Sequence, residues 1–146
     1  MSVEYYSDIR LHQKYRSREY PLTEEGIIAF AREWNPEPFH VDPETAKKSR
    51  IGGIFAAGPH LIAICVKLTN EKRPRPASVA GMGWDELRFL KPALPGDRLI
   101  AESEVISKRI SKSDPNYGIV RYAVQLLNQN DEPVLTYKVS VLVGKR

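Results

Sequence analysis

Cysteine is almost absent from this sequence, and the single Cys65 excludes an internal disulfide. Cys65 stands in the apolar run LIAICVKL with no evident base near it, so we interpret it as a small buried residue rather than a nucleophile.

No apolar run approaches the ~18 residues that a membrane helix needs. The start, MSVEYYSDIRLHQKYRS, carries acids and aromatics where a signal peptide would be apolar. We therefore expect a cytoplasmic protein without a membrane partner.

Sequence motifs typical of metal and nucleotide sites are missing as well. His12, His40 and His60 do not fall at a zinc-ligand spacing, and no glycine-rich phosphate loop or dinucleotide fingerprint is present. The net charge of +4 spreads 22 basic residues among 18 acidic ones, without a helix-turn-helix or an aromatic and basic surface motif. We therefore expect no metal, no cofactor and no nucleic acid, although a mildly basic surface suits a ligand that carries phosphates.

The length of 146 residues, with 42% hydrophobic and 27% charged residues, indicates one globular domain. After a predicted strand over residues 12–22, Thr23 is a good N-cap for a helix that Pro36 ends. The apolar residues of this helix recur at i, i+3, i+4 and i+7, as in an amphipathic helix: Ile27, Phe30, Ala31 and Trp34. The stretch NPEPFHVDPE predicts a stiff loop, and Asp42 is expected to cap a short helix over residues 44–48.

A buried helix and four strands are predicted for the rest of the chain. Residues 58–68 are apolar almost all round, which is typical of a helix buried on every side. Four segments rich in Val, Ile, Tyr and Leu follow, separated by turn-like breaks, at 78–90, 97–110, 117–129 and 133–144. Helices followed by an antiparallel run indicate the α+β class. We expect one antiparallel sheet wrapped around the central buried helix.

One stretch concentrates groups able to do chemistry, namely the residues from Asn35 to Asp42. Pro36 and Pro38 stiffen this stretch, so His40 would be presented in a defined direction, as a general acid or base requires. A loop histidine is more often a surface residue or a packed one. The spacing alone therefore does not decide whether His40 is a catalytic or a structural residue.

Three separated segments carry a family resemblance: FAREWNPEPFHVDPETA, GGIFAAGPHLIAI and GMGWDELRFLKPALPGDRL. The first is similar to the motif D-x-N-P-x-H-x-D-P of the MaoC-like dehydratases, which include the (R)-specific enoyl-CoA hydratases of the hot-dog fold. The second resembles that family's loop before the central helix, and the third resembles its later strand and P-G-D turn. The motifs occur in the family's order, so the resemblance implies a single MaoC-like hot-dog domain over residues 1–146.

The resemblance also assigns roles to individual residues. In that family an aspartate and a histidine hold a water that adds across the double bond of an enoyl thioester. The histidine corresponds to His40, and the backbone N–H of Gly58, at a helix start, would bind the thioester oxygen as it becomes enolate-like. The aspartate's position, five residues before the histidine, holds Asn35, and the family's asparagine position holds Glu37. An amide can position a water or orient His40, but it cannot accept the proton.

Four residues near these positions are expected to contact the substrate: Glu37, Phe39, Ala57 and His60. Glu37 either replaces the missing carboxylate or is a solvated loop acid. His60 is either a pocket wall or a core residue.

Other residues receive mainly structural interpretations. Trp34 and Trp84 are expected to be core or interface aromatics, and Asp85 and Arg88 to make a structural ion pair or hydrogen bonds between strands. Three basic residues either meet the phosphates of coenzyme A or are solvated: Lys108, Arg109 and Lys112.

These inferences predict a hydratase or dehydratase that acts on enoyl-CoA or 3-hydroxyacyl-CoA, or on the same acyl groups carried by an acyl carrier protein. The coenzyme A thioester is then a substrate and not a cofactor. The open edge of a small curved sheet favours a homodimer. The resemblance also implies that the active sites lie at the subunit interface. Because of Asn35, two alternatives stay open: a non-catalytic protein that binds acyl-CoA, and thioester hydrolysis with Glu37 or His40 as the base.

Overall fold

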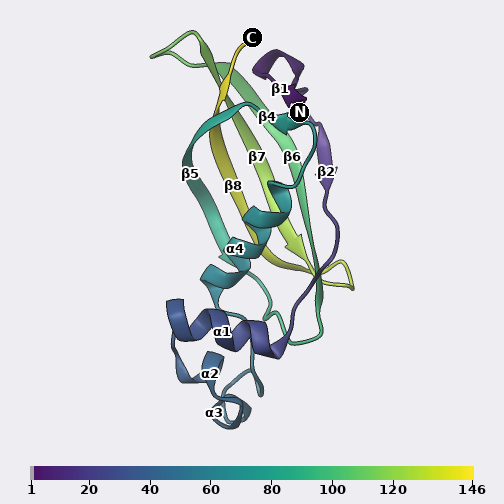
Figure 1. The fold of residues 1–146 in the computed structure, drawn as a ribbon, viewed down its shortest axis with the longest axis vertical. Coiled ribbons are helices and arrows are strands. Elements are labelled where there is room, and N and C mark those ends of the chain that lie inside the picture. The colour runs from purple at the N-terminus through teal and green to yellow at the C-terminus, as the bar shows by residue number, and fades with distance from the viewer. Residues whose placement is uncertain (1) are drawn as a thin grey trace.

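One antiparallel sheet forms the main layer of the molecule in the computed structural model, which describes residues 2–146 (Figure 1). Its four long strands are β5 (Ser78–Phe89), β6 (Arg98–Ile110), β7 (Tyr117–Leu127) and β8 (Pro133–Gly144). These strands agree closely with the four predicted segments. The sheet order is β2-β6-β7-β8-β5, so β5 lies at one edge.

Four short strands complete the β structure. They are β1 (Val3–Glu4), β2 (Lys14–Arg16), β3 (Tyr20–Pro21) and β4 (Arg75–Pro76). The prediction of one strand over residues 12–22 was wrong, because the pairing with β6 breaks into β2 and β3. At the break the Ser17 hydroxyl accepts a hydrogen bond from Ala101 N–H at 2.9 Å, in place of a backbone carbonyl.

The sheet curves around α4 (Gly58–Thr69), which runs across its concave face (Figure 1). Four apolar side chains of this helix are fully buried against the sheet: Leu61, Ile64, Cys65 and Leu68. Each buried Leu or Ile contributes roughly 1.5–3 kcal/mol relative to an exposed one, so burial of this face stabilises the helix more than its intrinsic propensity does. The predicted central helix is confirmed. No helix among residues 2–146 is long and apolar enough to cross a membrane.

Alternation along the strands supplies the other side of this core. On β7, Val124 and Leu126 face α4, whereas Ala123 and Gln125, which alternate with them, lie on the outer face. Val124 pairs with Tyr137 of β8, whose ring belongs to the same core. The period of two in the sequence therefore decides which face of the sheet receives the helix.

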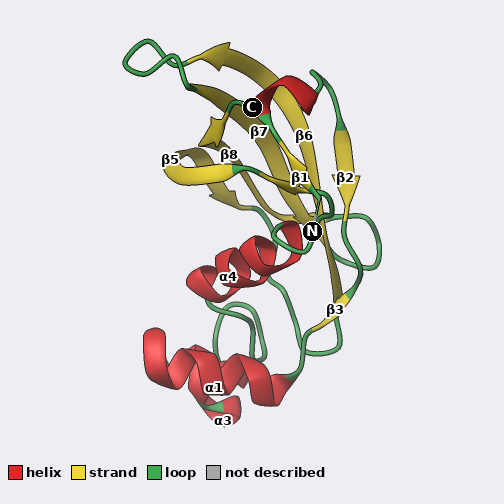
Figure 2. Ribbon diagram, turned by 45° about the horizontal axis from the view of Figure 1, so that its top comes forward, coloured by secondary structure: helices red, strands yellow, loops and turns green. Residues whose placement is uncertain are grey.

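A second layer of short helices lies against the N-terminal end of α4 (Figure 2). It contains α1 (Glu24–Trp34), α2 (Pro38–Val41) and α3 (Pro43–Lys47), while η1 (Tyr6–Asp8) lies near the N-terminus of the chain. Thr23 caps α1 by accepting a hydrogen bond from Gly26 N–H at 3.0 Å, and Asp42 caps α3 by accepting from Glu44 N–H at 3.1 Å. Hydrogen bonds from the Thr45 hydroxyl and from Glu44 N–H lower the pKa of Asp42, which strengthens its role as a cap.

The prediction that NPEPFHVDPE is entirely loop was wrong, because Pro38–Val41 forms the helix α2. Pro38 occupies the first position of α2, where a proline has no backbone N–H to lose and its fixed φ suits a helix. Pro38 was expected to stiffen a loop, whereas in the structure it begins a helix.

The structure decides between alternatives that the sequence left open for several side chains. Trp34 and Trp84 are 66% and 51% exposed, so neither is a core residue of the chain. Of the two alternatives for Asp85, the structure has a hydrogen bond between strands and not an ion pair with Arg88: the Asp85 carboxylate accepts from Arg121 of β7 at 3.0 Å. The ammonium group of Lys108 donates to the carbonyls of Tyr6 and Ile9, which holds η1 on β6 and removes this lysine from the candidates for phosphate binding.

Candidate active site

His40 lies in the last turn of α2 and is buried, with 5% of its surface exposed. Its Nδ1 lies 2.8 Å from the backbone carbonyl oxygen of Phe55. A carbonyl oxygen only accepts hydrogen bonds, so Nδ1 must carry a proton. In the neutral ring, Nε2 is then unprotonated and able to accept a proton.

Two aromatic rings hold the imidazole in one orientation. Phe39 and Phe55 lie parallel to each other with their centroids 5.5 Å apart. Their planes make angles of 71° and 70° with the plane of the His40 imidazole, at centroid distances of 4.6 and 4.7 Å. Rings at these distances attract each other and exclude water from the sides of the imidazole. The imidazole of His40 is therefore held in one orientation by its neighbours.

The backbone between Asn35 and His40 is tied together residue by residue. Asn35 ends α1, where its N–H donates to the Ala31 carbonyl at 2.8 Å, and its own carbonyl accepts from Glu37 N–H at 2.8 Å. The Glu37 carbonyl in turn accepts from His40 N–H at 2.9 Å. Asn35 is half-buried, whereas Glu37 is exposed at the N-cap of α2.

Gly58 is the first residue of α4 and follows the fully buried N-cap residue Ala57. The Ala57 carbonyl accepts hydrogen bonds from His60 and Leu61. Within residues 2–146 no backbone hydrogen bond uses the N–H of Gly58, and Pro59 has none to offer. Gly58 N–H is thus a free donor at the positive end of a helix dipole.

The hydrogen bond between His40 and Phe55 brings the base and this donor into one region. Phe55 precedes Gly58 by three residues, and three residues span at most about 10–11 Å of extended chain. The predicted residues Phe39, His40, Ala57 and Gly58 therefore gather below the N-terminal end of α4.

His60 packs against α1 in this region. Its ring stacks on Phe30 with the centroids 4.4 Å apart and the planes 5° from parallel. The ring is 6% exposed, and its buried Nδ1 has no hydrogen-bond partner within the described residues. Burial lowers the pKa of His60 below its ordinary value, so the imidazole is neutral at pH 7.

Phe89, at the end of β5, is a residue of this region that the sequence did not single out. A Cβ atom at Gly58 would lie 2.7 Å from the Cζ atom of Phe89, so the glycine allows the aromatic ring to approach the helix start. Phe89 is nevertheless 50% exposed, which leaves the other side of the ring uncovered within the chain.

Comparison with known proteins identifies the family to which this arrangement belongs. The family described as the MaoC like domain matches residues 8–126, a span that includes α1, α2, α4 and three of the long strands. The chain belongs to the MaoC-like dehydratase family. This confirms the resemblance carried by the three sequence segments.

Relatives of this MaoC-like protein include both solved structures and curated sequences. The solved MaoC-like dehydratase of Rhodospirillum rubrum is 34% identical, with a TM-score of 0.91 and 97% of each chain covered. The uncharacterized Bacillus subtilis protein YdeM is 30% identical and covers 94% of this chain and 97% of its own. Mesaconyl-CoA hydratase of Cereibacter sphaeroides is 45% identical over 69 residues, which are 47% of this chain and 20% of that protein. The architecture is the hot-dog fold, as predicted.

Proposed function

We propose that this MaoC-like protein adds water to an α,β-unsaturated acyl thioester, or removes water from the corresponding 3-hydroxyacyl thioester. One observation carries the proposal: the hydrogen bond from His40 Nδ1 to the Phe55 carbonyl, which leaves Nε2 as a base of fixed direction. The free N–H of Gly58 and the family membership support the same reaction.

The proposed reaction begins with a water molecule held at Nε2 of His40. The imidazole takes one proton of the water while the water oxygen forms a bond to C3 of the enoyl group. The electrons of the double bond move toward the thioester, and the negative charge that develops on its oxygen is stabilised by Gly58 N–H and the dipole of α4. The imidazolium then returns the proton to C2. One water is consumed and no co-reactant is needed.

Asn35 determines how the protons must move in this scheme. Its amide can donate to and accept from the water, but it cannot hold a proton between steps. His40 therefore has to act first as the base and then as the acid. A reaction in which His40 alone carries both proton transfers is expected to be slower than one with a carboxylate beside the histidine. One group must then serve as base and as acid in turn.

The substrate is expected to be a coenzyme A thioester. The match to mesaconyl-CoA hydratase, an enzyme named for a coenzyme A thioester, supports this choice over an acyl carrier protein. Arg109 and Lys112 are exposed and remain candidates for the phosphates. The direct test is the absorbance of crotonyl-CoA and longer enoyl-CoAs with purified protein. Loss of the conjugated double bond supports the proposal, and bound but unchanged enoyl-CoA contradicts it.

A second function is favoured by Asn35 itself. Without a carboxylate at this position the protein would keep the oriented His40 and the free Gly58 N–H, but it would hydrate enoyl-CoA slowly or not at all. It would then act as a binding protein for acyl-CoA. Calorimetric binding of enoyl-CoA without hydration or hydrolysis distinguishes this function from the first, and release of free coenzyme A would identify a thioesterase.

Replacing Gly58 by valine is expected to weaken acyl-CoA binding by about tenfold or more, because the new side chain displaces the Phe89 ring and crowds the N–H donor. Isothermal calorimetry with a non-reactive acyl-CoA measures the effect. Gly53→Val is the matched control, since a Cβ at Gly53 meets nothing within 4 Å. Unchanged affinity in a folded Gly58→Val protein would remove Gly58 from the site.

We further propose that the protein is a homodimer that pairs through β5. This strand is an edge of the sheet, and exposed apolar side chains gather on it and just beyond it: Val79, Met82, Trp84, Phe89 and Leu90. An edge strand with unpaired backbone groups and such side chains is a typical surface for a second copy.

Light scattering at micromolar concentration is expected to give twice the 16.6 kDa mass of one chain. Val79→Lys should shift the protein toward the monomer, because the charge would be buried between two strands. Val3→Lys, at an exposed site on β1, is the matched control and should leave the dimer intact. A stable monomer for the unmodified protein would count against β5 as an interface.

A further inference from the structure

His60 is a buried imidazole two residues beyond Gly58, with 6% of its surface exposed. Its Nδ1 is buried and has no hydrogen-bond partner within residues 2–146. A buried polar atom without a partner destabilises the folded chain, whereas an apolar ring of similar shape would fill the same space without this cost. Packing alone therefore does not explain a histidine at this position.

The burial of Nδ1 determines which ring nitrogen of His60 carries the proton. A neutral imidazole has one N–H donor and one acceptor nitrogen, and buried N–H groups without a partner are rare in folded proteins. Nδ1 therefore holds the lone pair, and Nε2 carries the proton. No described residue accepts a hydrogen bond from Nε2, which, unlike Nδ1, keeps some exposed surface. His60 thus presents a free N–H donor.

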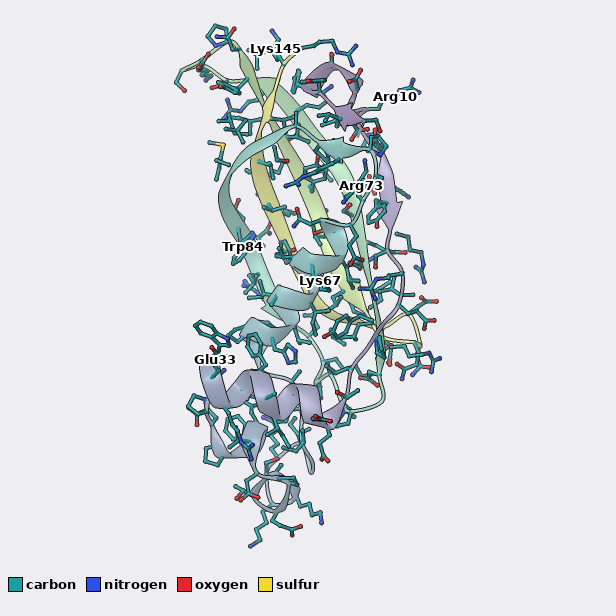
Figure 3. All side chains as sticks on the ribbon, viewed as in Figure 1. Arg10, Glu33, Lys67, Arg73, Trp84 and Lys145 are labelled. Atoms are coloured by element: carbon teal, nitrogen blue, oxygen red, sulfur yellow. The ribbon has the colours of Figure 1, made fainter. Side chains whose placement is uncertain are left out.

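The position of His60 in α4 directs this donor toward Gly58. His60 is the third residue of the helix, and helical side chains lean toward the N-terminus of their helix. The ring therefore covers the turn that begins at Gly58. Its stacking on Phe30 of α1 agrees with this direction. Figure 3 shows α1, labelled at Glu33, beside the start of α4, whereas Lys67 lies on turns of α4 farther from α1.

His60 is suited to donate a hydrogen bond and not to take up a proton. Burial lowers its pKa, and the positive end of the α4 dipole disfavours an additional positive charge there. A neutral imidazole at a helix N-terminus polarises a carbonyl group by donating a hydrogen bond to it. The two histidines of the region therefore differ at Nε2, which is an acceptor in His40 and a donor in His60.

We propose that the N–H at Nε2 of His60 donates a second hydrogen bond to the thioester oxygen, beside the bond from Gly58 N–H. The inference rests on the proposed function and adds a residue that contacts the substrate. Two donors then share the negative charge that develops on this oxygen during hydration. His60 keeps its proton throughout, so the proton transfers of His40 are unchanged. The stacking on Phe30 holds the second donor in place before the reaction begins.

His60→Phe separates this role from packing. The phenyl ring can still stack on Phe30, but it has no donor, and the unpartnered Nδ1 is gone. The melting temperature should rise by about 3 °C or more, because the cost of the buried polar atom is removed. At the same time kcat for crotonyl-CoA should fall about 10²- to 10³-fold, as expected when one donor to the oxyanion is lost. Calorimetric affinity for unreactive butyryl-CoA should change much less, since the donor acts mainly on the charge of the transition state.

His60→Gln should show the opposite pattern. Its amide N–H can lie close to the position of Nε2, but the stacked ring is lost. The melting temperature should therefore fall, while kcat stays within about tenfold of the unmodified protein. His12→Asn is the control, because it removes an exposed imidazole that contacts Glu104, and it should leave kcat unchanged. Activity that follows stability in both His60 variants would mean a purely structural His60 and would contradict the proposal.

Infrared spectroscopy tests the contact without turnover. Hydrogen-bond donors lower the stretching frequency of a carbonyl, which difference spectra of butyryl-CoA, isotope-labelled at its carbonyl carbon, report in the bound state. The frequency should be lower in the unmodified protein and in His60→Gln than in His60→Phe. Equal frequencies in all three proteins, or no binding of butyryl-CoA, overturn the proposal. Absence of crotonyl-CoA hydration in the unmodified protein overturns the hydratase instead, and the carbonyl frequency then still decides on the contact with His60.

Discussion

Replacing His40 by asparagine is expected to lower kcat/KM for enoyl-CoA hydration by about 10²- to 10⁴-fold, or roughly 3 to 5 kcal/mol of barrier. The asparagine amide places a donor close to the position of Nδ1 and so keeps the hydrogen bond to the Phe55 carbonyl. It has no atom at the position of Nε2, where the proton of the water is taken. Single-turnover kinetics with crotonyl-CoA measures the loss.

A second substitution separates chemistry from packing at the same site. His40→Gln keeps polar atoms near the position of Nε2 but loses the donor to Phe55, so it should disturb the support between Phe39 and Phe55 as well as the base. Thermal unfolding of both variants shows whether the fold survives. A folded His40→Asn protein that keeps more than about a tenth of the activity contradicts the assignment of His40 as the base.

Much of the fold follows from the sequence because two hydrophobic patterns are clear in it: the alternation of strands and the continuous apolar run of a buried helix. The alternation along residues 117–129 and 133–144 predicts strands with one buried face, and the structure has β7 and β8 there with the α4 side buried. The uniformly apolar residues 58–68 predict a buried helix, which is α4. Both patterns survive in the structure because burial of these faces dominates the folding free energy.

The errors come from features that depend on partners distant in sequence. The sequence predicts for Asp85 either an ion pair with Arg88 or a hydrogen bond to another strand, but it does not identify the partner on that strand. A cross-strand neighbour, Arg121, lies closer in space once β5, β8 and β7 are side by side. Likewise Lys108 contacts the carbonyls of Tyr6 and Ile9, about a hundred positions away in the chain. Sequence patterns identify strands and helices, but they do not identify such pairs.

The candidate site shows the same division. The sequence alone points to His40, because of its ionisable side chain, and to Ala57 and Gly58, because they stand where the central helix begins. The group that orients His40 is a backbone carbonyl, that of Phe55, and every residue has one. Phe89 reaches Gly58 only because β5 ends beside the start of α4. Neither contact has a signature in the order of amino acids.

Asn35→Asp is expected to raise the rate of enoyl-CoA hydration by about 10²- to 10⁴-fold, the contribution that a general acid–base group typically makes. The substitution is nearly isosteric at the half-buried end of α1, and no side-chain hydrogen bond of Asn35 within residues 2–146 is lost by it. The new carboxylate lies at the negative end of the helix dipole. This raises its pKa and costs about 0.3–1 kcal/mol of stability, which a small decrease in the melting temperature would show.

The gain must depend on His40, so the double variant Asn35→Asp with His40→Ala should lose it. A slow unmodified protein with a large gain identifies a weakened hydratase, or one now used for binding. A fast unmodified protein that Asn35→Asp slows indicates that the amide is suited to a different proton path, with His40 or Glu37 as the sole base. If neither protein hydrates enoyl-CoA but both bind it, the pocket serves binding or another thioester. We expect the first result, because the hydrogen bonds that hold residues 35 to 40 together, the support of His40 by Phe55 and the free N–H of Gly58 are all in place around Asn35.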